Sequence, residues 1–156
     1  MLNITTFLDA NACRLDKTVF YCPERDVSYT SKEILAISSE IARQIQALGV
    51  EKGDRVMLYM NSTPEYLFSY FAVWRLGAVA IPTNRVYTPS ELAYMVENSG
   101  AKVIITDAEG VSSAPQSVTL MQTINLTRAK TGASTLCKHF GCGITVCDVG
   151  VNADIK

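Results

Sequence analysis

Few residue types in this 156-residue chain suit nucleophilic or metal-dependent catalysis. His139 is the only histidine, so a histidine-based metal cluster is excluded. Cys137, Cys142 and Cys147 are spaced by five residues, whereas a Cys-x-x-Cys zinc site needs a spacing of three, and we interpret them as small buried side chains. The sequence therefore predicts no catalytic constellation and no metal site.

Two further groups of residues have a functional and a structural interpretation. Glu109, Asp148 and Asp154 lie near predicted strand ends, where ligands bind in parallel α/β sheets, but a solvated or capping role is favoured. The aromatic residues within the range 66–74 suggest either a base-stacking platform or a packing surface. Helical spacing distributes them over more than one face, which favours packing.

The elements that would position such residues alternate between strands and helices. Apolar side chains at three- or four-residue spacing predict a helix that begins at Thr30 or Ser31 and ends at Gly49. Threonine–proline pairs that start a helix and glycines that end one predict two more helices, over 63–76 and 88–99. Short apolar or β-branched runs predict strands over 18–21, 27–29, 55–60, 78–82 and 102–106.

Beyond Gly110 the pattern predicts helices over 117–130 and 132–140, followed by a strand over 144–149. We expect the strands 102–106 and 144–149 to be parallel neighbours joined by a right-handed crossover. The predicted fold class is α/β, with three layers and a mostly parallel sheet covered by helices on both faces. It is built from two partial domains, residues 1–108 and 109–156.

Composition narrows the possible partners and the cellular location. The formal net charge of -1 argues against nucleic acid as a partner, and 48% hydrophobic residues are typical of a globular chain. The sequence contains no apolar run long enough to span a membrane and shows no secretory signal. An odd number of cysteines, five, favours reduced thiols, so we expect a cytoplasmic protein.

Four stretches carry a family resemblance: VSYTSKEI at 27–34, LGVEKGDRV at 48–56, NSTPEY at 61–66 and WRLGAVAIPTN at 74–84. In order and spacing, residues 5–108 resemble the N-terminal segment of the acyl-adenylate-forming ligases, the AMP-binding acyl-CoA synthetase family. The resemblance implies a scaffold role. That family binds ATP through a Ser/Thr/Gly-rich loop ending in Pro-Lys-Gly, and the sequence contains neither this loop nor the family's later nucleotide-binding motifs. We therefore expect no adenylation, no catalytic residue and no cofactor.

A second resemblance is carried by GVSSAPQSVT at 110–119, GAS at 132–134 and VCDVGVNAD at 146–154. These residues resemble the nicotinate-nucleotide:dimethylbenzimidazole phosphoribosyltransferases. The resemblance implies that Gln122, on the helix after the loop, binds substrate in a benzimidazole pocket. Ala114 stands where that family often has serine, and the family's glycine-rich phosphate site and catalytic glutamate are missing.

We thus expect fused enzyme fragments without autonomous catalysis. One alternative is an AMP-forming acyl-CoA ligase, as the larger part suggests. Another is a phosphoribosyltransferase or a weak benzimidazole-binding module, as the smaller part suggests. Because each part would leave apolar surface uncovered, including the aromatic helix over 66–74, we also expect self-association.

Overall fold

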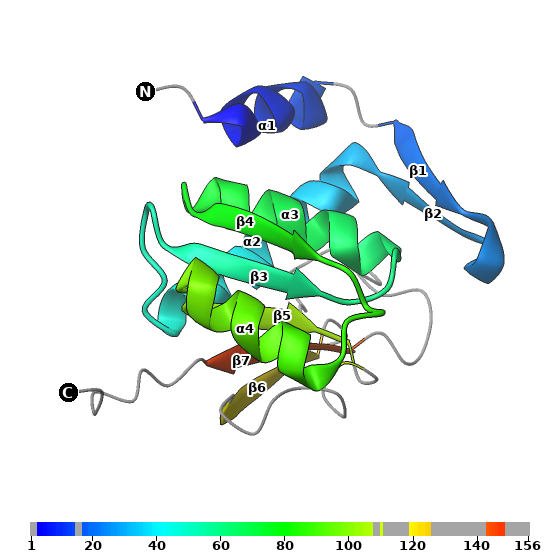
Figure 1. Cartoon of the computed structure of the whole chain (residues 1–156). Coiled ribbons are helices and arrows are strands. Elements are labelled where there is room, and N and C mark those ends of the chain that lie inside the picture. The colour runs from blue at the N-terminus through cyan, green and yellow to red at the C-terminus, as the bar shows by residue number, and fades with distance from the viewer. Residues whose placement is uncertain (1–2, 15–16, 108–109, 111–118, 126–142, 149–156) are drawn as a thin grey trace.

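The computed structural model describes residues 3–14, 17–107, 110, 119–125 and 143–148. Its helices are α1 (Ile4–Arg14), α2 (Ser31–Ala47), α3 (Pro64–Arg75) and α4 (Pro89–Ser99), with a short 3-10 turn, η1, at Pro23–Arg25. Its strands are β1 (Thr18–Cys22), β2 (Val27–Thr30), β3 (Arg55–Tyr59), β4 (Val79–Thr83), β5 (Val103–Thr106), β6 (Thr119–Asn125) and β7 (Gly143–Asp148). Figure 1 shows their arrangement.

The main sheet has five strands in the order β4-β3-β5-β7-β6. β3 pairs in parallel with β4 on one side and with β5 on the other. Strands β1 and β2 form a separate antiparallel hairpin. Helices α2 and α3 cover one face of the sheet and α4 covers the other (Figure 1). The predicted α/β class, its three layers and the parallel portion of the sheet are thereby confirmed.

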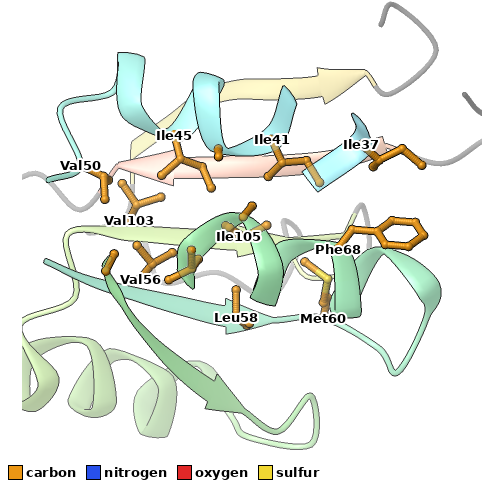
Figure 2. Packing of buried hydrophobic residues seen from close by; sticks show 14 of the residues in the cluster. Ile37, Ile41, Ile45, Val50, Val56, Leu58, Met60, Phe68, Val103 and Ile105 are labelled. Atoms are coloured by element: carbon orange, nitrogen blue, oxygen red, sulfur yellow. The ribbon is translucent and has the colours of Figure 1, made fainter. Parts of the chain in front are cut away.

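Alternating side chains along β3 and β5 fill two cores. Val56, Leu58 and Ile105 point to the α2–α3 face, whereas Met57 and Ile104 belong to the cluster under α4. This period of two is what a strand buried on both faces requires. Figure 2 shows the larger core, in which Ile37, Ile41 and Ile45 of α2 face the sheet residues.

Local signals explain where the two best-defined helices begin. At the start of α2 the Thr30 hydroxyl accepts a hydrogen bond from the Glu33 backbone N–H, and the Glu33 carboxylate accepts one from the Thr30 N–H. Thr88 and Glu91 form the same reciprocal pair at the start of α4. Each such capping box satisfies two backbone donors that the helix leaves unpaired. The predicted starts of both helices are confirmed.

Two sequence-based predictions are wrong. Residues 119–125 form a strand, β6, where a helix was predicted over 117–130. β7 lies next to β5 as predicted, but it pairs antiparallel to it. Parallel neighbours need a crossover between them, and here the intervening strand β6 instead pairs antiparallel with β7. Helix α1 was not predicted from the sequence. The predicted helix over 132–140 lies outside the described residues.

The aromatic residues of α3 are mostly part of the core. Phe68 is buried, with its ring edge against Tyr29 at a centroid distance of 4.9 Å. Tyr66, Tyr70 and Trp74 are half-buried, and their rings contact one another in sequence along the helix. The interpretation of this run as a packing surface is confirmed. The expected self-association stays a prediction. In the part of the chain that the structure describes, no helix is long and apolar enough to cross a membrane.

Candidate functional site at the carboxyl edge of the parallel strands

A cavity of about 420 Å³ lies where β3 and β4 end. The register explains why these ends coincide: Tyr59, the last residue of β3, is opposite Thr83 of β4 and Thr106 of β5. In parallel sheets this edge is where ligands bind. The cavity is lined by the last two residues of β4, by residues that follow the two strands and by one residue of α3: Met60, Asn61, Ser62, Tyr66, Pro82, Thr83, Asn84, Arg85 and Tyr87.

Asp107, directly after β5, holds the neighbouring loops at this edge through two hydrogen bonds. One carboxylate oxygen accepts a hydrogen bond from the Asn61 N–H at 2.9 Å, and the other accepts one from the Gly110 N–H at 2.8 Å. The adjacent Thr106 hydroxyl, buried, donates to the Tyr59 carbonyl at 2.5 Å. Hydrogen bonds to a carboxylate are stronger than neutral ones. Asp107 therefore fixes the position of the β3 loop relative to the chain after β5.

Gly110 fits this arrangement because it has no side chain. A Cβ atom there would lie 1.8 Å from the Thr106 Oγ1 and 3.1 Å from the Tyr59 carbonyl oxygen. Non-bonded atoms do not approach to 1.8 Å, and the 3.1 Å separation is also tight. Any other residue at position 110 would therefore force Thr106 to move.

Arg85 supplies the positive charge of the cavity. Its side chain is 16% exposed, its Cζ lies 4.7 Å from the centroid of the Tyr59 ring, and its Nε lies 3.8 Å from an Asp107 oxygen. A guanidinium on an aromatic face near a carboxylate is held by cation–π and ionic attraction together. Because the guanidinium carries hydrogen-bond donors and no acceptor, the cavity suits a ligand with an anionic or acceptor group.

Tyr66 lines the same cavity as a neutral hydrogen-bonding group. Burial, followed by its hydrogen bond with Tyr70, raises the pKa of Tyr66 to about 12. The phenol therefore stays protonated at neutral pH. The described lining residues offer amide, hydroxyl and guanidinium groups that can form hydrogen bonds to a ligand.

The predicted site residues lie elsewhere. Gln122 is on strand β6, opposite Val146 of β7, and so not on a helix as predicted. β6 is the far edge of the sheet, and Gln122 is absent from the described cavity lining. Asp148 pairs with Val103, the first residue of β5, which places it toward the opposite edge of the sheet. Glu109, Ala114, His139 and Asp154 lie outside the described residues, as do Cys137 and Cys142.

Sequence reasoning missed the residues that the structure brings together here. Asn61, Arg85 and Asp107 each come within two residues of the end of a parallel strand. This position after the strand was the available signal. Across the described ranges, no three His, Cys, Asp or Glu side chains are grouped so as to hold a metal ion.

Comparisons with known proteins agree on one family. The profile described as AMP-binding enzyme matches residues 7–139. The 3-hydroxybenzoate/4-hydroxybenzoate–CoA ligase of Thauera aromatica is 33% identical over 94 residues, which is 60% of this chain and 18% of that protein. 4-Coumarate–CoA ligase 3 of Oryza sativa subsp. japonica is 41% identical over 81 residues, 52% of this chain and 15% of that protein.

Solved structures show the same likeness. A Mycobacterium tuberculosis fatty acyl CoA synthetase superposes with a TM-score of 0.66 at 32% identity, over 71% of this chain and 22% of that one. The anthranilate CoA ligase AuaEII, solved with anthranoyl-AMP, gives a TM-score of 0.66 at 26% identity, over 71% of this chain and 21% of that one. The chain thus spans less than a fifth of the two curated relatives above. The resemblance to the N-terminal segment of the ligases is confirmed, and the chain belongs to the AMP-binding enzyme family.

Proposed function

We propose that the chain is a scaffold portion of an AMP-forming acid–thiol ligase. Such an enzyme joins a carboxylic acid to AMP, with release of pyrophosphate from ATP, and then transfers the acyl group to the thiol of CoA, with release of AMP. The observation that carries the proposal is the parallel β4-β3-β5 unit, with a cavity where β3 and β4 end, in a chain whose residues 7–139 match the AMP-binding enzyme family.

The contribution of this portion is geometric. Its parallel strands align three loops, and Asp107 and Arg85 hold two of them at the carboxyl edge. Preorganised loops of this kind hold reactants in position and supply charge near them, without forming covalent bonds to them. The phosphate-binding loop that adenylation needs has no counterpart in the sequence. We therefore infer that the 156 residues alone do not form an acyl adenylate.

A segment exchange tests the scaffold proposal. Residues 7–107 replace the matching segment of the rice 4-coumarate–CoA ligase, and formation of the CoA thioester from 4-coumarate is followed by absorbance. We expect measurable ligase activity, because a scaffold segment needs only to present the same strand ends. A control chimera carrying Met57→Asp, which places a charge in the core under α4, should be inactive. A chimera that folds but forms no thioester would overturn the proposal.

The isolated chain gives the complementary test. Calorimetric titration with Mg-ATP and an ATP–pyrophosphate exchange assay should both show nothing. Saturable ATP affinity in the micromolar range, or exchange dependent on a carboxylic acid, would show that these residues adenylate on their own.

We also propose that residues 109–156 are a fragment related to the phosphoribosyltransferases. The sequence VCDVGVNAD at 146–154 supports this, and it lies beyond residue 139, where the match to the AMP-binding profile ends. Any remaining activity would be weak binding of a benzimidazole-like base near Gln122. Titration with dimethylbenzimidazole should then shift the backbone amide resonances of β6 and β7. Unchanged spectra at saturating base would reject this assignment.

A further inference from the structure

A second cavity, of about 380 Å³, lies among α1, β1, α2 and α3. Its volume is within the range of about 300–1,000 Å³ that small-molecule sites occupy. It shares no described lining residue with the cavity at the ends of β3 and β4. All four elements contribute apolar side chains to its walls: Leu8, Phe20, Ile34, Leu35, Leu67 and Phe71. This cavity is therefore a candidate ligand site that is independent of the carboxyl edge.

The polar side chains at this cavity are engaged mainly within the protein. The Asp9 carboxylate accepts two hydrogen bonds from the Arg75 guanidinium, so these opposite charges compensate each other. The buried Ser38 hydroxyl donates to the Leu35 carbonyl at 3.1 Å. Lys17, which is also charged, is exposed to solvent. Because a charged ligand would lose its hydration among apolar side chains and displace none of these pairs, the ligand that fits is uncharged.

Two aromatic side chains at the cavity narrow the ligand further. Phe20 of β1 and Phe71 of α3 both line it, and both are half-buried. Each ring already contacts one other ring: the centroids of Phe20 and Tyr29 are 6.4 Å apart, and those of Phe71 and Trp74 are 6.0 Å apart. Aromatic rings attract one another through tilted, edge-to-face and offset contacts at such distances. A ring bound in the cavity would extend these contacts.

We propose that this cavity binds a neutral aromatic ring compound, which packs against Phe20, Phe71 and the leucine side chains of α1, α2 and α3. Such a molecule has no carboxyl group that a ligase could join to AMP, so the site is not a substrate site of the proposed enzyme and goes beyond the scaffold function. Because Leu8 belongs to α1, the bound ring also adds to the packing of this helix, which the Asp9–Arg75 pair already connects to α3.

Titration of the full chain with indole, followed by NMR and calorimetry, tests the proposal. We expect saturable binding, with amide shifts concentrated in α1, β1, α2 and α3. Sodium benzoate keeps an aromatic ring but carries a charge, and it should bind at least about tenfold more weakly because its carboxylate would lose hydration. Cyclohexanol is neutral but not aromatic, and it should also bind more weakly than indole. The titrations contain neither ATP nor CoA, so their outcome is independent of the ligase proposal.

Three variants locate the bound ring. Leu35→Trp on α2 and Leu8→Trp on α1 fill the cavity from two different walls, so one of them still tests the proposal if circular dichroism shows that the other is unfolded. Each folded variant should bind indole at least about tenfold more weakly. Tyr94→Trp is the control, because Tyr94 is exposed on α4 and does not line the cavity, and it should leave indole binding unchanged. Absence of saturable indole binding would overturn the proposal. So would equal binding of benzoate or cyclohexanol, or unchanged indole binding in a folded cavity variant.

Discussion

The contact between Gly110 and Thr106 makes a quantitative prediction about the candidate site. Alanine at position 110 would place its Cβ 1.8 Å from the Thr106 Oγ1, so the buried threonine must move. Overpacking of this kind costs about 1–3 kcal/mol. The displaced hydroxyl would also lose its hydrogen bond to the Tyr59 carbonyl, worth about 1 kcal/mol. We expect Gly110→Ala to lower the free energy of unfolding by about 3 kcal/mol.

A double-mutant cycle tests whether that cost comes from this one contact. Thr106→Ala removes the Oγ1 and should cost about 1–2 kcal/mol alone. In the double variant the 1.8 Å clash is gone, although a 3.1 Å contact with the Tyr59 carbonyl remains. The double variant should therefore lose about 2 kcal/mol less than the two single changes added together.

Urea unfolding followed by circular dichroism measures each corner of the cycle. Gly53→Ala is the matched control, because a Cβ at Gly53 meets nothing within 4 Å and its cost comes from the backbone φ of +89°. That change should be additive with Thr106→Ala within about 0.5 kcal/mol. If the losses of unfolding free energy for Gly110→Ala and Thr106→Ala were also additive, Gly110 would not pack against Thr106, and the prediction would be wrong.

Three further predictions concern the core, one ionisable group and the surface. Ile41→Ala should lower the free energy of unfolding by about 2–5 kcal/mol, because Ile41 is fully buried, whereas the exposed Arg43→Ala should change it by less than about 0.5 kcal/mol. Because the pKa of Tyr66 is raised in the folded state, its contribution to the free energy of unfolding is fully present below the usual tyrosine pKa near 10. That contribution is lost as the pH rises toward 12. Tyr66→Phe should flatten the fall in unfolding free energy over that interval, and a fall of unchanged slope would contradict the pKa. Val79 is half-exposed on the edge strand β4, so we expect light scattering to show a dimer or larger species. Val79→Lys should reduce this association. A monodisperse monomer at high concentration would refute the prediction.

The fold was predictable wherever a local signal and a tertiary requirement agreed. Thr30 and Glu33 satisfy backbone donors within one turn, so these two residues are enough to predict the start of α2. The range 119–125 is different, since its apolar residues fit a helix face as well as a strand. Pairing with β7 makes it a strand, and no local pattern contains that partner. Helix α1 likewise depends on distant contacts, including the bond from the Asn3 side chain to the Trp74 carbonyl at 2.6 Å.

The candidate site was less predictable than the fold, because its residues are neighbours only across strands. Arg85 and Asp107 are ordinary charged residues in the sequence, and their proximity follows from the register that aligns Tyr59 with Thr106. The resemblance to the phosphoribosyltransferases predicted Gln122 as a substrate-binding residue, and in the structure Gln122 lies on β6, the far edge strand of the sheet. Composition and periodicity carry no information on strand order, and strand order decides which loops meet.

β7 lies beyond the residues that match the AMP-binding profile, yet it pairs with β5, which lies within them. Val103–Thr106 pair residue by residue with Thr145–Asp148. That pairing covers the side of β5 that β3 does not reach, so β5 becomes an inner strand instead of an exposed edge. Thr106 and Asp107, which organise the cavity, stand at the end of this same strand. The carboxyl edge of the parallel unit is thus held from one side by β3 and from the other by residues that lie beyond the ligase-like segment in sequence.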